Sequence, residues 1–222
     1  MDLMEAMKSR HSVRSYKDQA ISGDTRHELQ AFISQLNQES ELNMQLILNE
    51  PKAFSGLLAH YGKFFGAVNY IALVGEKGPK LDETCGYYGE KVVLKAQQLG
   101  LNTCWAALTY SKVKGAFQIK KNEKLRCVIA VGYGATQGIG HPVKPIEKLC
   151  TADGPLPPWF RQGVEAAQLA PTAMNQQKFR FLLKNDVVSA EPGSGFYTKV
   201  DLGIAKCHFE IGAGGADWRW AR

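Results

Sequence analysis

Residues 9–16, SRHSVRSY, bring two arginines, a histidine and three serines into one short stretch near the start of the chain. Arg10 and Arg14 flank Ser12 at a regular spacing. Guanidinium groups supply paired, charged donors that match a phosphate group, and a neighbouring hydroxyl adds a further hydrogen bond. The segment therefore indicates an anion site, although two surface arginines held in salt bridges would give the same pattern.

The other residues that could do chemistry favour binding rather than acid–base or metal catalysis. The glycine-rich runs GYGATQGIG and GAGGAD match neither G-x-G-x-x-G nor a P-loop, and no nucleophile elbow or Ser-His-Asp arrangement is found. The histidines lack the spacing of metal ligands, so no metal site and no catalytic side chain is predicted. We expect a bound cofactor to carry the chemistry.

Composition indicates an ordinary globular chain of 222 residues with a net charge of +6. Its basic residues are dispersed, which argues against nucleic acid and favours an anionic small molecule. The apolar runs are too short to span a membrane, and five scattered cysteines form no C-x-x-C pair. We expect a cytoplasmic protein with reduced thiols and no membrane partner.

The elements that must position these residues alternate irregularly between helix and strand. Helical patterns cover residues 2–9, 23–38, 51–62, 82–99, 159–170 and 200–213, and strand patterns cover 43–49, 68–76, 103–110, 124–134 and 178–185. Ser22 has the character of an N-cap residue, and Gly100 that of a helix-ending glycine. This order predicts an α+β fold, with a central, mostly antiparallel sheet flanked by helices.

The two parts of the chain share a faint pattern. NMQLIL (43–48) and NQQKFRF (175–181) both begin Asn-x-Gln, and residues 89–105 align without gaps to 204–220, so that Trp105 meets Trp220. The pattern predicts a single unit, 1–222, of two pseudo-symmetric halves, about 1–150 and 151–222, that resemble a fused dimer.

Four stretches together resemble the FMN-dependent nitroreductase family, in particular a subgroup with two half-modules in one chain. SRHSVRSY is similar to its R-x-S-x-R segment, QLGLNTCWAAL to the segment beside the flavin, GYGATQGIGHPVKPIEKL to a strand and tail that return a basic side chain, and LAPTAMNQQKFRF to A-P-S-x-x-N-x-Q-P-W-x-F. The resemblance covers nearly the whole chain.

The resemblance implies a set of FMN-binding residues drawn from all four stretches. They are Arg10, His11, Ser12, Arg14, Ala107, Leu108, Lys144, Pro171, Thr172, Asn175 and Gln177. Ala107 stands where many members have glutamate, and the A-P-S-like stretch occurs late in the chain rather than soon after the arginines. Without the resemblance, Asn175 and Gln177 could equally be a turn residue and a strand-edge amide.

The implied activity is an FMN-dependent NAD(P)H oxidoreductase with ping-pong transfer, in which flavin N5 takes hydride from NADH or NADPH and an electron-poor nitroaromatic or quinone then accepts electrons. Two alternatives stay open: a relative that fragments flavin or removes halide reductively, and a flavin-binding protein without turnover. Because the arginines occur only in the first half and the A-P-S-like stretch only in the second, we expect one FMN per chain, in a monomer or weak homodimer.

Overall fold

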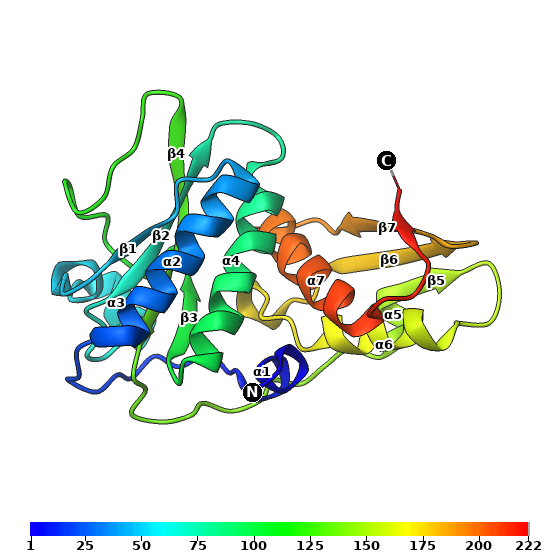
Figure 1. Cartoon of the computed structure of the whole chain (residues 1–222), viewed down its shortest axis with the longest axis horizontal. Helices are drawn as coiled ribbons and strands as arrows, with labels where there is room; N and C mark the ends of the chain where they lie inside the picture. Colours follow the sequence, from blue (N-terminus) through cyan, green and yellow to red (C-terminus); the bar gives the residue numbers. More distant parts are fainter. Residues whose placement is uncertain (222) are drawn as a thin grey trace.

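The computed structural model describes residues 1–221, which form an α+β protein with two four-stranded sheets (Figure 1). The helices are α1 (Leu3–Ser9), α2 (Gly23–Ser40), α3 (Leu57–Tyr61), α4 (Leu81–Gln98), α5 (Ile146–Leu149), α6 (Pro158–Gln168) and α7 (Thr198–Ala213), with 3₁₀ turns η1 (Pro51–Phe54) and η2 (Ala173–Asn175). The strands are β1 (Gln45–Ile47), β2 (Tyr70–Glu76), β3 (Asn102–Ala106), β4 (Glu123–Gly132), β5 (Cys150–Ala152), β6 (Phe179–Lys184), β7 (Val187–Pro192) and β8 (Arg219–Trp220).

The first sheet has the order β1-β2-β4-β3, and every neighbouring pair is antiparallel. Helices α2 and α4 cover one face, where Leu29 and Ile33 of α2 and Val92 of α4 pack with Ile71 and other buried strand residues. The other face is covered by η1, α3 and the segment after β3, around Phe54 and Phe64. The central strands are thus buried on both faces, which explains the nearly continuous apolar sequence of β2.

The second sheet has the order β5-β6-β7-β8 and is mixed, since only β6 and β7 are antiparallel. Helices α6 and α7 pack on it around an aromatic cluster of Phe160, Phe181 and Phe209, three side chains that are fully buried. The alternating exposure of β6 matches a strand with one face toward this cluster. The expected single central sheet is therefore divided into two, one in each half of the chain.

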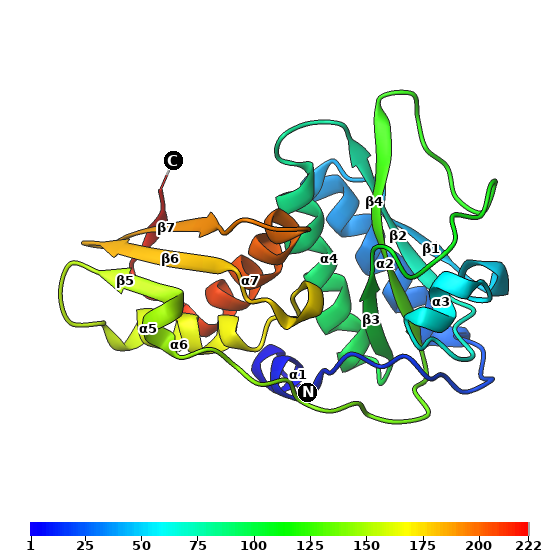
Figure 2. The same ribbon diagram turned by 180° about the vertical axis from the view of Figure 1, so that it is seen from behind.

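Helices α4 and α7 form the junction between the two halves, and both views of the molecule show them between the sheets (Figures 1 and 2). Gly86 and Gly203 lie at their crossing. A Cβ on Gly86 would overlap the carbonyl oxygen of Val200, and a Cβ on Gly203 would overlap that of Glu83. The two helix backbones approach this closely because neither position carries a side chain.

The halves share one order of elements: helix, two antiparallel strands, a long helix, and a short strand. In the first half these are α2, β1, β2, α4 and β3, and in the second α6, β6, β7, α7 and β8. The first half also contains β4, which lies between β2 and β3, whereas β8 pairs directly with β7. Within residues 1–221 the second half has no strand in the position of β4.

Most elements lie where the sequence pattern places them. Helix α1 begins with a capping box formed by Asp2 and Glu5, and Ser22 is the N-cap residue of α2, without a side-chain capping bond. The helix expected over 51–62 is broken into η1 and α3, and β7 was not predicted. Among the described residues, no helix is long and apolar enough to cross a membrane.

Two extended segments complete the frame of the site. Residues 10–16 follow the outer edge of β3, where Ser12 forms a parallel bridge with Thr103 and the Val13 amide donates to the Thr103 carbonyl at 3.0 Å. The segment from β4 to α5 then crosses from the first half to the second, passing near α1 (Figure 2).

Candidate functional site

The arginines of the N-terminal segment lie in different surroundings, although they are only four residues apart. Arg10 is the C-cap residue of α1 and is 4% exposed, whereas Arg14 is exposed at the mouth of a cavity. Arg10 Nε has no hydrogen-bond partner among the described residues. Burial lowers the pKa of Arg10, and the charge of Glu90 opposes that shift. A buried cation with an unused donor is the feature expected where an anionic ligand completes the site.

The cavity beside Arg14 has a volume of about 320 Å³. Its lining comes from two segments of the first half besides residues 10–16, and consists of Arg14, Tyr61, Gly62, Lys63, Trp105 and Thr109. Arg14 and Lys63 give it two positive charges and no acidic side chain, so it suits an anion.

Lys63 is a cavity residue that the sequence pattern did not reveal. It adopts a left-handed backbone conformation with φ of 59° directly after Gly62, the C-cap residue of α3. The turn is fixed by the Phe65 amide, which donates to the Arg14 carbonyl at 2.9 Å, and by Gly66, where a Cβ would lie 2.6 Å from the Tyr16 carbonyl oxygen. The only local sequence feature that could have pointed to Lys63 is the Gly-Lys pair after a short helix.

Ser12 and the arginines also surround the thiol of Cys104. Burial raises the pKa of Cys104, while Arg14, a hydrogen bond with Ser12, and Arg10 lower it. The predicted flavin-edge residues follow directly after β3, which ends at Ala106 and is shorter than the strand expected over 103–110: Ala107 is half-buried and Leu108 is 67% exposed. The structure thus gathers Arg10, Ser12, Arg14, Ala107 and Leu108 along β3 and its continuation.

The remaining predicted residues form a separate group, which joins a loop of the second half to Lys144 on the segment between β4 and α5. The Lys144 ammonium donates to the carbonyls of Gln176 and Gln177 at 2.6 and 3.0 Å, and its backbone amide donates to Gln177 Oε1. The Gln177 amide in turn donates to Pro142 and to Asn175 Oδ1.

Two further residues fix the loop of this second group. The Thr172 hydroxyl accepts from the backbone amide of Gln177 at 3.0 Å, and Pro171 is buried beside it. Asp201, at the start of α7, accepts the Ala173 amide and the Gln176 side chain. The loop holds Met174, Asn175 and Gln177 at positive φ, a strained conformation that its hydrogen bonds maintain.

His11 and the connecting segment lie between the two groups. Gly138 approaches His11 so closely that a Cβ there would lie 2.8 Å from the His11 Cβ, and His141 Nε2 lies 3.4 Å from the Leu169 carbonyl oxygen. Burial lowers the pKa of His11, and the charges of Arg10 and His141 lower it further. No hydrogen bond between described residues joins the two groups directly.

Other side chains that could do chemistry are buried or unclustered. All five cysteines are unpaired and buried. Within the described part of the chain, no group of three or more His, Cys, Asp or Glu residues could hold a metal ion. Trp105 and Trp220 are partly buried against the second core, and their indole N–H groups bond to Glu90 and Glu210.

Comparison with solved structures identifies the fold. A "putative nitroreductase" of Thermotoga maritima aligns with a TM-score of 0.66 and 24% identity, over 94% of this chain and 82% of that one. A "putative nitroreductase" in complex with FMN from Desulfovibrio desulfuricans aligns with a TM-score of 0.53 and 20% identity, over 71% of this chain and 99% of the other. A nitroreductase family protein from Streptococcus pneumoniae aligns with a TM-score of 0.53 and 13% identity, over 66% and 98%.

At these identities the solved structures establish a nitroreductase-like fold alone. No curated protein matches the sequence. A family model described as "Putative TM nitroreductase" matches residues 2–213, which is nearly the whole chain. The chain therefore belongs to this nitroreductase family and is, at the level of the family, an oxidoreductase.

Proposed function

We propose that the protein is an FMN-dependent oxidoreductase that takes electrons from NADH or NADPH and passes them to an electron-poor acceptor such as a nitroaromatic or quinone. The observation that carries the proposal is the buried Arg10, whose Nε lacks a partner, on the same short segment as Arg14, which lines a cavity together with Lys63. Family membership and the FMN complex of the Desulfovibrio relative support the choice of flavin.

The residues present fit a flavin phosphate. A phosphate dianion would satisfy the unused donor of Arg10 and the cavity cations Arg14 and Lys63, with Ser12 available as a neutral donor. Each such charge-assisted hydrogen bond contributes on the order of 1.5–3 kcal/mol. Lys63 joins the proposed ligand set on this ground.

The other predicted residues have two proposed tasks. The exposed backbone at Ala107 and Leu108 would lie along the flavin ring, where amide groups can orient it without a side chain. The loop with Thr172, Asn175 and Gln177, held by Lys144 and Asp201, would close the site from the second half. Lys144 would then act through this loop, because its ammonium already bonds to two loop carbonyls.

When bound, FMN supplies hydride acceptance and electron delivery, so the protein groups need only bind and orient the reactants. Positive charge from Arg10, Arg14 and Lys63 would favour the electron-rich reduced cofactor. No protein acid or nucleophile is required for this chemistry.

The test is purification of the protein, identification of the flavin released on denaturation, and anaerobic mixing of the FMN-loaded protein with NADH or NADPH. We expect FMN to be released and its visible absorbance to be bleached by at least one nucleotide. An FMN-loaded protein reduced by neither nucleotide would contradict the proposed electron donors. A protein that does not bind FMN would contradict the whole proposal.

A further inference from the structure

Glu90 is a fully buried carboxylate whose two oxygens are both engaged. It lies on α4 at the junction of the halves. Its Oε2 accepts the indole N–H of Trp105 at 3.0 Å, and its Oε1 lies 2.9 Å from Nε2 of His208 on α7. A buried carboxylate is costly unless it is paired, so each of these contacts contributes to holding Glu90 in place.

His208 is fully buried, and both of its ring nitrogens face oxygen atoms. Nδ1 lies 3.1 Å from the Ala166 carbonyl oxygen, which can only accept, so Nδ1 carries a hydrogen. The contact between Nε2 and Glu90 Oε1 then needs one proton, on either the imidazole or the carboxyl group. In both cases the Glu90–His208 pair has no net charge.

Glu90 is the acid whose charge opposes the lowering of the pKa of buried Arg10, yet the two do not form an ion pair. No carboxylate oxygen of the described residues lies within 4.0 Å of its guanidinium nitrogens, and Nε has no partner. An unpaired buried arginine near a buried acid would ordinarily move to pair with it, since a lone buried charge is far more costly than a pair. With Trp105 and His208 on its two oxygens, Glu90 has neither oxygen free of a partner for Arg10.

We propose that His208 is a positioning residue for the flavin site: by sharing a proton with Glu90 it neutralises this acid and keeps Arg10 available for an anionic ligand. The residue comes from the second half and acts on a binding group of the first. The inference rests on the proposed function, because the ligand that Arg10 awaits is the proposed FMN.

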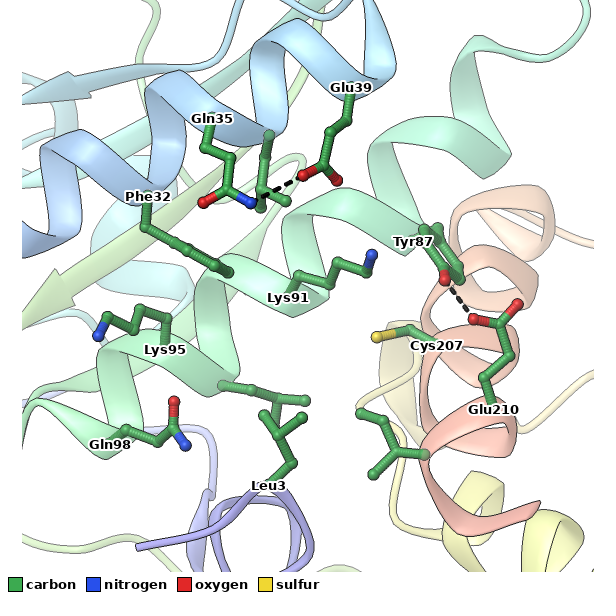
Figure 3. A pocket seen from close by; sticks show the side chains of 13 residues that line it. Leu3, Phe32, Gln35, Glu39, Tyr87, Lys91, Lys95, Gln98, Cys207 and Glu210 are labelled. Atoms are coloured by element: carbon green, nitrogen blue, oxygen red, sulfur yellow. Dashed lines mark hydrogen bonds between the residues drawn. The ribbon is translucent and has the colours of Figure 1, made fainter. Parts of the chain in front are cut away.

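A second carboxylate, Glu210 on α7, has a comparable indole contact but a tyrosine in place of the histidine. Glu210 accepts the indole N–H of Trp220 at 2.6 Å. It also accepts the hydroxyl of Tyr87 on α4 (Figure 3). Burial and the hydrogen bond to Glu210 raise the pKa of Tyr87 far above its usual range, so this phenol stays protonated and donates to Glu210. Tyr87 therefore provides a natural control for His208.

The experiment measures FMN affinity by fluorescence titration in four proteins: wild type, H208L, E90Q and the double variant E90Q/H208L. In H208L, Glu90 loses the histidine on Oε1, which leaves this oxygen free to pair with Arg10 in place of FMN, and we expect FMN affinity to fall by roughly tenfold or more. E90Q removes the competing acid, so this variant should bind FMN at least as tightly as wild type. E90Q/H208L should recover most of the affinity lost in H208L.

Three measurements keep the outcomes separate. Y87F, which breaks the matching contact at Glu210, should leave FMN affinity unchanged, and urea unfolding should show that the variants are folded. If H208L does not fold, H208Q replaces it with the same expected order. In flavin-free protein, the shared proton should give a strongly downfield proton NMR signal that is absent from E90Q.

Unchanged affinity in H208L, or a double variant that binds as weakly as H208L, would overturn the inference while leaving the proposed function intact. Absence of the downfield signal in wild type would also overturn it. If wild type does not bind FMN, the proposed function fails first, and the NMR signal then tests the Glu90–His208 pair alone.

Discussion

At the scale of single residues, Arg10 and Arg14 would contribute to the proposed phosphate site in different ways. Arg10 is buried and fixed at the end of α1, so it loses little further freedom when a ligand binds. Arg14 is exposed at the cavity mouth, where it is free to meet an incoming anion. A fixed donor holds the bound anion in one orientation, and an exposed positive charge attracts the anion from a longer distance.

Arg14→Ala should weaken FMN binding by roughly one to two orders of magnitude, the effect of one lost charge-assisted contact. Arg26→Ala is the matched control, since Arg26 is also exposed but lies on α2, outside the cavity lining. Titration of FMN fluorescence compares the two variants. Equal affinity in Arg14→Ala and Arg26→Ala would remove Arg14 from the ligand set.

We expect the stability of the folded protein to depend on pH through the carboxyl group of Asp201. Burial raises the pKa of Asp201 from 3.8 to about 6, although hydrogen bonds from Ala173 and Gln176 oppose this shift. The folded protein therefore holds the proton more tightly than the unfolded chain between about pH 4 and pH 6. The contribution of protonated Asp201 to the free energy of unfolding is therefore present below about pH 4 and is lost as the pH rises through about 6.

We therefore expect the unfolding free energy of wild type, relative to Asp201→Asn, to fall by on the order of 3 kcal/mol between pH 4 and pH 7. Urea unfolding of both proteins at several pH values gives this difference and cancels groups that titrate in both. A difference that does not change with pH would show that Asp201 is not buried as the structure has it.

The sequence could indicate a group of candidate residues where they lay on one short segment, and it could not where packing brought segments together; the flavin-binding role of these residues stays a prediction. The spacing of Arg10, Ser12 and Arg14 is local, and the structure places all three along β3. Lys63 reaches Arg14 only because the turn after α3 packs against residues 14–16. Likewise, nothing local links Glu90 to His208, which are 118 residues apart.

At the scale of elements, long helices with a periodic apolar face were predicted well, and short strands were not. Helix α4, expected over 82–99, spans Leu81–Gln98. Strand β7 was missed because its sequence, VVSAEP, ends in Glu-Pro and is half exposed. Its place between β6 and β8 is set by the helices beneath it rather than by its own pattern.

The crossing of α4 and α7 gives a test at this scale. Gly86→Ala places a methyl group against the backbone of Val200, and rigid backbone cannot move aside as a side chain would. We expect a net loss of roughly 2 kcal/mol, because the overpacking cost exceeds the gain in helix propensity. Gly78→Ala, where nothing lies within 4 Å, is the control and should change stability by less than about 0.5 kcal/mol. Equal urea midpoints for the two variants would contradict the close crossing.

At the scale of the whole molecule, the two halves differ in what they can contribute to a site. The arginine segment and the cavity with Lys63 belong to the first half, while the strained loop held by Asp201 belongs to the second. The indole–carboxylate contact of Trp105 with Glu90 has a counterpart in that of Trp220 with Glu210. We interpret the repeated order of elements as a fused pair of modules, and we propose that only one of them carries the arginine segment of the site.

One chain should therefore bind one FMN without help from a second chain. We expect a flavin-to-protein ratio of about one from absorbance after denaturation, and the same ratio at protein concentrations where light scattering finds only monomers. The reasoning is that each proposed ligand, from Arg10 to Gln177, is supplied once by a single chain whose halves already pack through α4 and α7. A ratio near two would mean that the second half holds a site of its own. Loss of flavin on dilution of a dimer to monomers would mean that the site needs a partner chain, and the fused-pair interpretation would then be wrong.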